Sequence, residues 1–138
     1  MVFTIRQNST LPILKMKLTS SSQMVLEDLF KEGRTIDVSF SMRDEKTERY
    51  MILNDIGRFH TKIGSNGSPE YFISYRFSEK NTEKVGTFIA SFMIAVRKGA
   101  DIIHILRVPI IENLYINIKE SIGTNEAPKN TQKGGIIC

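Results

Sequence analysis

The sequence predicts an all-β protein, an antiparallel β-sandwich or barrel of about seven to nine short strands. Several segments alternate apolar and polar residues with the period of two that a half-buried strand requires. Clusters of turn-forming and charged residues separate these segments at regular intervals, namely RDEKTER (43–49), GSNGSP (64–69), SEKNTEK (78–84) and RKGAD (97–101). Regular turn signals between short alternating segments are typical of sandwiches and barrels.

Each alternating segment has one apolar face, which we expect to point into the core. The predicted inward residues are Leu14, Met16 and Leu18; Ile36, Val38, Phe40 and Met42; Tyr71, Ile73, Tyr75 and Phe77; and Leu114, Ile116 and Ile118. The opposite faces are more polar, as with Lys15 and Lys17 in the first of these segments. We therefore expect the apolar faces to close against each other.

The segment GTFIASFMIAV, residues 86–96, is apolar at almost every position and carries no charge. It is shorter than the roughly 20 residues that a membrane-spanning helix needs. Its neighbours have the period of a strand and are rich in β-branched and aromatic residues. We therefore expect a central strand that is covered on both faces.

Two segments depart from the strand pattern. SQMVLEDLFKEG, residues 22–33, has the spacing of one or two helical turns. Residues 120–138, ESIGTNEAPKNTQKGGIIC, contain little apolar material and are expected to form a flexible tail beside a sandwich domain at 1–119. The tail ends in Ile136, Ile137 and Cys138. It is either a disordered end or an arm whose apolar tip contacts a neighbouring subunit.

Composition limits the classes of function. The 138 residues fit one compact domain, and the 41% hydrophobic and 25% charged content is ordinary for a soluble protein. The net charge of +4 is spread thinly, and no run of Lys and Arg is interleaved with stacking aromatics. Cys138 is the single cysteine, so no disulfide framework is expected. The first residues carry no features of a secretory signal, and we expect synthesis in the host cytoplasm.

The sequence holds few groups that support chemistry. The ionisable and nucleophilic candidates are His60 and His104, the carboxylate pairs Asp44 with Glu45 and Glu79 with Glu83, and the triplet Ser20, Ser21 and Ser22. A zinc site needs three or four ligands, and a phosphate loop needs a Lys after its glycines, which GSNG lacks. We therefore expect no enzyme, and no catalytic, metal or cofactor site.

The order of the segments resembles a known module. FTIRQNSTLPILKMKL (3–18), TIDVSFSMRDEKTERYMILN (35–54), YFISYRFSEKNTEKVGTFIASFMI (71–94) and VPIIENLYINI (108–118) carry the resemblance. Together they are similar to the immunoglobulin-like N-terminal module of bacteriophage baseplate upper proteins and of related small tail, neck and head-fibre proteins. The resemblance covers about residues 3–118. It implies an immunoglobulin-like sandwich that acts as a rigid adaptor.

The expected function is therefore that of a non-enzymatic virion structural protein of a tailed bacteriophage. It would be an adaptor or decoration module in the tail or baseplate, the neck or the head fibre. The implied partners are portal or neck, tail, fibre or capsid subunits, bound in multiple copies or as a homo-oligomer, without a membrane or a cofactor.

Two alternatives stay open. One is a small β-barrel that binds single-stranded nucleic acid, motivated by the basic balance and by Tyr71, Tyr75 and Phe77. We do not expect nucleic acid as a partner, because the alternation places these three aromatics in the core. The other is a carbohydrate-binding β-sandwich, which needs exposed aromatic platforms in a chain that has no Trp.

Overall fold

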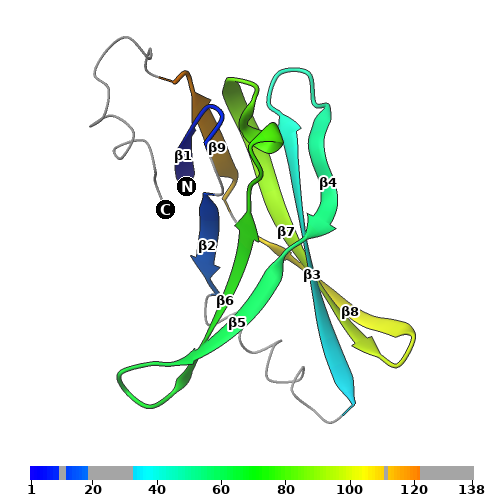
Figure 1. The fold of residues 1–138 in the computed structure, drawn as a ribbon. Helices are drawn as coiled ribbons and strands as arrows, with labels where there is room; N and C mark the ends of the chain where they lie inside the picture. Colours follow the sequence, from blue (N-terminus) through cyan, green and yellow to red (C-terminus); the bar gives the residue numbers. More distant parts are fainter. Residues whose placement is uncertain (10–11, 19–32, 111, 122–138) are drawn as a thin grey trace.

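Strands make up most of the chain that the structure, a computed structural model, describes, namely residues 1–9, 12–18, 33–110 and 112–121 (Figure 1). The elements in order are β1 Val2–Arg6, β2 Ile13–Lys17, β3 Arg34–Asp44, β4 Tyr50–Ile56, β5 Arg58–Ile63, β6 Pro69–Arg76, the short 3-10 helix η2 Lys80–Thr82, β7 Gly86–Lys98, β8 Asp101–Val108 and β9 Leu114–Lys119. The prediction of an all-β protein with about seven to nine strands is confirmed. β3 and β7 are longer than expected, with 11 and 13 residues.

The strands form two sheets that pack into a sandwich. The larger sheet has the order β1-β9-β7-β3-β4, with β8 paired to β7, and the smaller has the order β2-β6-β5. β9 and β8 share one side of β7, because β9 pairs with its first residues and β8 with its last. The expectation of purely antiparallel pairing is wrong in one place, since β1 runs parallel to β9. Parallel neighbours need a long connection, and here the whole intervening domain supplies it.

β7 is the central strand of the larger sheet, as predicted, and pairs with β3, β8 and β9. Its inward residues, from Phe88 to Val96 at alternate positions, are buried. The prediction that both faces are covered is wrong, because Ile89, Met93 and Ala95 on the second face remain partly exposed. The smaller sheet covers only one face of the larger sheet. The apolar and small residues on the second face of β7 are therefore partly exposed to solvent.

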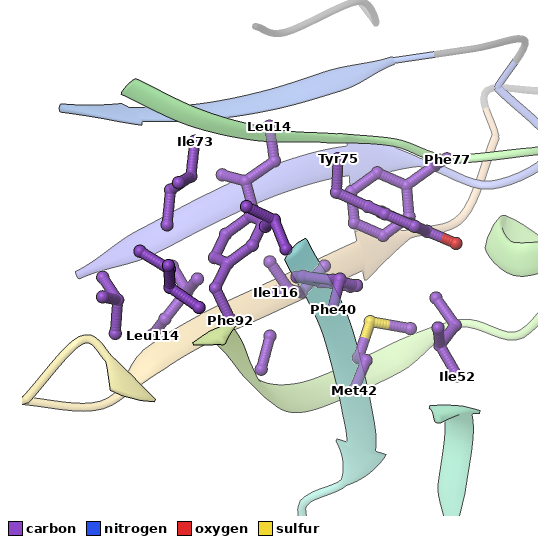
Figure 2. Close-up of a cluster of buried hydrophobic side chains, with 14 of the residues drawn as sticks. Leu14, Phe40, Met42, Ile52, Ile73, Tyr75, Phe77, Phe92, Leu114 and Ile116 are labelled. Atoms are coloured by element: carbon purple, nitrogen blue, oxygen red, sulfur yellow. The ribbon is translucent and has the colours of Figure 1, made fainter. Parts of the chain in front are cut away.

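The core lies between the two sheets and centres on Phe40 (Figure 2). The Phe40 ring stacks on Tyr75 at a centroid distance of 4.3 Å and contacts Phe92 at 5.0 Å and Phe77 at 5.5 Å. The predicted inward faces are confirmed: all of their residues are buried except Met16 and Ile36, which are half-buried. Offset and edge-to-face aromatic contacts add stability beyond the area they bury.

Gly57 marks the point where the chain leaves one sheet for the other. It is the single residue between β4 of the larger sheet and β5 of the smaller sheet. Its backbone N–H donates to the Val38 carbonyl at 2.8 Å, which ties this corner to β3. A Cβ atom at this position would lie 2.9 Å from Val38 Cγ1 and 3.0 Å from the Ser74 carbonyl oxygen. The corner therefore has room for glycine alone.

The turn between β3 and β4 is organised by the Asp44 carboxylate. The backbone N–H groups of Lys46 and Thr47 donate to Asp44 Oδ1 at 2.8 and 3.0 Å. Lys84 Nζ lies 3.3 Å from Oδ2. These backbone hydrogen bonds, with the Lys84 ammonium as a smaller cause, hold the pKa of Asp44 below its ordinary value.

Asp44 should therefore make stability depend on pH. A carboxyl with a lowered folded-state pKa stabilises the fold above its unfolded pKa of about 3.9, and this contribution is lost as pH falls through the folded pKa. We expect Asp44→Asn to be less stable than the parent at pH 7 and to lose less stability between pH 5 and pH 2. Thermal melting across that range measures both effects. Glu45→Gln, an exposed carboxylate on the same turn, is the matched control, and an equal change in both variants would contradict the assignment.

Two predictions fall on residues that the structure does not describe. The helical turn expected at 22–33 lies outside the described residues apart from Gly33. The predicted contact tip Ile136, Ile137 and Cys138 also lies outside them. β9 ends at Lys119, so the division at 119 and the role of the tail stay predictions.

Candidate functional site

The residues considered for chemistry lie apart. His60 is on β5, where its Nε2 shares a hydrogen bond of 2.8 Å with Ser74 Oγ, whereas His104 is exposed on β8 of the other sheet. Asp44 is occupied by its turn, and Glu79 and Glu83 are exposed beside η2. Ser20, Ser21 and Ser22 lie outside the described residues.

Neither a metal site nor a spanning helix emerges from the part of the chain that the structure covers. Among the described residues, no three His, Cys, Asp or Glu side chains are grouped so that they can hold a metal ion. None of the described helical segments has the length and apolar character to cross a bilayer.

β8 is an edge strand with an apolar surface. Among the described strands it pairs with β7 alone. Ile102, Ile103 and Ile105 remain 42–53% exposed. Proteins usually blunt sheet edges with Lys, Pro or bulges, because unpaired backbone groups beside apolar side chains invite pairing with another chain. We call Ile102, Ile103 and Ile105 the β8 edge.

β4 forms the opposite rim of the same sheet. It pairs with β3 among the described strands, while β8 lies on the far side of β7. Tyr50, Met51, Leu53 and Ile56 are exposed, and Ile56 reaches 83%. We call these four residues the β4 edge. The two edges hold seven of the twelve exposed large hydrophobic residues in the described chain, so the apolar surface is gathered at two rims.

The outward face of the smaller sheet is basic. Strand register places four rows of side chains on it, listed along β6: Ile13 with Arg76; Lys15, Ser74 and Arg58; Lys17, Phe72 and His60; and Glu70 with Lys62. The five cations of these rows share the face with the half-exposed ring of Phe72, and Glu70 is the one carboxylate of the rows. Rows two residues apart along a strand are separated by about 6.7 Å. We call this surface the basic face.

Lys17 and Lys15 each have a direct partner on the face, and the charge of Lys62 also acts on Glu70, its neighbour across the strands. Lys17 Nζ donates to Glu70 Oε2 at 2.8 Å, and this bond is the main cause that lowers the pKa of Glu70. Lys15 Nζ lies 4.8 Å from the centroid of the Phe72 ring, in the geometry of a cation–π contact. In the described chain, none of the ion pairs involves Arg58, Lys62 or Arg76.

A hollow of about 440 Å³ opens at one end of the basic face. Its lining includes Lys15, Arg58 and Arg76 together with the polar groups of His60 and Ser74. Asp55 also borders it, but its carboxylate accepts a hydrogen bond from the Tyr75 hydroxyl at 2.5 Å. That bond and the burial of Tyr75 raise the pKa of the Tyr75 hydroxyl, with burial as the larger cause.

The aromatic residues that motivated the nucleic-acid alternative are not on this surface. Tyr71, Tyr75 and Phe77 are buried at 8%, 3% and 0% exposure, as their alternation predicted. Phe72 lies between two of them in the sequence and faces the other way. Its grouping with cations was missed because they come from three strands. The sequence feature that could have indicated the basic face is the Lys or Arg on the polar side of each of these three strands.

No protein-family model, no curated protein and no solved structure matches the chain. Its function is therefore inferred from its residues and their geometry.

Proposed function

We propose that the chain is a non-enzymatic structural adaptor that works through protein–protein contacts in a phage particle. The observation that carries the proposal is the gathering of exposed apolar side chains on the β8 edge and the β4 edge. Exposed apolar patches mark interaction surfaces, since monomeric proteins rarely leave them open. The resemblance described above supplies the setting of a virion tail, neck or head fibre.

The partner that fits the β8 edge is a strand of a neighbouring virion subunit. An added strand would satisfy the backbone groups of β8 that face away from β7, and its side chains would cover Ile102, Ile103 and Ile105. Burying a half-exposed isoleucine contributes on the order of 1 kcal/mol. Three such residues make a weak contact in one copy, and repetition around a particle multiplies its effect.

The position of the two edges suits an adaptor. They lie on opposite sides of the β7–β3 pair, so two neighbours can bind without competing for one surface. When the β8 edge of one subunit contacts a different surface of its neighbour, the contact is heterologous. Repeated heterologous contacts generate rings or rows of subunits. The tip at Ile136, Ile137 and Cys138 stays a predicted third contact.

The test is incorporation into particles. We expect mass spectrometry of purified virions to find the chain in multiple copies. We expect the double variant Ile102→Lys with Ile105→Lys to be lost from the particles, because lysine on an edge strand opposes pairing. The control is Ile63→Lys, compared with each single variant Ile102→Lys and Ile105→Lys, because it adds the same side chain at a residue that is 68% exposed on the smaller sheet. A chain that is monomeric in solution and absent from particles would contradict the proposal.

A further inference from the structure

We propose that the basic face is a binding surface for single-stranded nucleic acid, with Phe72 as the ring on which a base stacks. This surface is separate from the apolar edges, which lie on the other sheet. It also differs from the alternative drawn from Tyr71, Tyr75 and Phe77, since all three are buried.

The charge of the basic face favours a polyanion. Lys15, Lys17, Arg58, Lys62 and Arg76 share one side of a three-stranded sheet with a single carboxylate, Glu70. The whole chain has a net charge of +4, so this one face concentrates the positive charge that the rest of the chain balances. Phosphate contacts of Lys and Arg supply most of the affinity of non-specific nucleic-acid binding.

The aromatic ring at the centre favours nucleic acid over an acidic protein. Phe72 stands in the middle strand, with Lys17 and His60 on its two sides and the row of Lys15 and Arg58 next to it. Single-strand binders combine a positive surface that follows the backbone with aromatic rings on which bases stack. In this structure, the Lys15 ammonium lies over the Phe72 ring, 4.8 Å from its centroid. Since this side chain is long and flexible, a stacked base can replace it while the ammonium moves to a phosphate.

The shape of the surface favours a single strand over a duplex. The described face is the open surface of a three-stranded sheet made of β2, β6 and β5. The bases of a duplex are stacked on each other and cannot reach Phe72. The hollow beside Arg58 and Arg76 also holds Lys15, His60 and Ser74, and its one carboxylate, Asp55, accepts a hydrogen bond from Tyr75. These cations and donors suit a phosphate of the same strand.

Binding of a fluorescently labelled oligothymidylate to the full chain tests the proposal. If four phosphates are neutralised, the slope of log K against log salt should be about −3, and affinity should fall roughly fifty-fold between 50 and 200 mM salt. We expect Phe72→Leu to weaken binding by about five-fold or more, because the stacking of a base on the ring is lost. Phe72→Tyr keeps a ring and should restore binding. Thermal melting checks that each variant folds.

A charge-matched pair of variants separates the basic face from net charge. Arg58→Gln with Arg76→Gln should reduce the size of the slope by about 1.4. Lys46→Gln with Lys98→Gln changes the net charge equally at exposed positions away from the basic face, in the turn between β3 and β4 and at the end of β7, and should leave the slope unchanged. An equal effect of both double variants would overturn the proposal.

Three further results would also overturn it: no binding at 50 mM salt, equal affinity for double-stranded DNA with no effect of Phe72→Leu, or displacement by polyglutamate as effective as by unlabelled oligothymidylate. The last result would assign the face to an acidic protein. None of these outcomes affects the particle test. Its variants change Ile102 and Ile105 on β8 and Ile63 on β5, and none of these residues belongs to the basic face.

Discussion

Phe40→Ala is expected to lower the free energy of unfolding by about 3–5 kcal/mol, the cost of removing a large aromatic side chain from a packed core. Phe40 is 0% exposed and contacts the rings of Tyr75, Phe77 and Phe92. It belongs to β3 of the larger sheet, whereas Tyr75 belongs to β6 of the smaller one, so its ring joins the two layers (Figure 2). The cavity left by alanine cannot close without moving the sheets together.

Urea unfolding followed by circular dichroism measures this effect. Phe3→Ala is the matched control, because Phe3 is half-buried on the edge strand β1 and packs at the margin of the core. We expect Phe3→Ala to cost clearly less than Phe40→Ala. If the two variants lost the same free energy, Phe40 would not be the centre of the core.

Gly57→Ala is expected to destabilise the fold by about 1–3 kcal/mol, the usual cost of adding a group to a filled space. The added Cβ would lie 2.9 Å from Val38 Cγ1 and 3.0 Å from the Ser74 carbonyl oxygen. The Ser74 carbonyl oxygen is a backbone atom of β6, the middle strand of the smaller sheet. Ser74 pairs with β2 on one side and with β5 on the other. It cannot move aside without disturbing both pairings, so the corner itself must open.

Gly64→Ala provides the matched control for this prediction. A Cβ at Gly64 would meet the Glu70 side chain at 3.0 Å, and that side chain is flexible and can turn away. We expect Gly64→Ala to change the midpoint of unfolding much less than Gly57→Ala. A tolerated alanine at Gly57 would mean that the crossing between the sheets is looser than the distances indicate.

The orientation of individual strands was predictable because it depends on local alternation. Successive side chains of a strand point to opposite faces, so the pattern around Phe40 or Tyr75 indicates which side is buried without knowledge of the partner strand. The central position of β7 was predictable for a similar reason, since its apolar run has no solvent-facing charge until Arg97. What failed at β7 was the covering of its second face, where Ile89 and Met93 stay partly exposed.

The candidate surfaces were not predictable in the same way. An isoleucine such as Ile105 is exposed because β8 is an edge, and strand order in a sheet is a property of distant pairings. In the sequence, a nucleic-acid surface is indicated by cations and aromatics that follow one another along the chain. In the folded protein Lys15, Phe72 and Arg58 are neighbours through register, although they are far apart in sequence.

By itself, therefore, the sequence determined three things: the protein is all-β, most strands have a known inward face, and the turns lie at known places along the chain. The tertiary structure alone decided that β1 joins the sheet in parallel, that β4 and β8 are rims, and that five cations share one sheet face with Phe72. The reason is physical. A strand's faces follow from the geometry of its own backbone, whereas its neighbours are selected by the free energy of packing the whole chain.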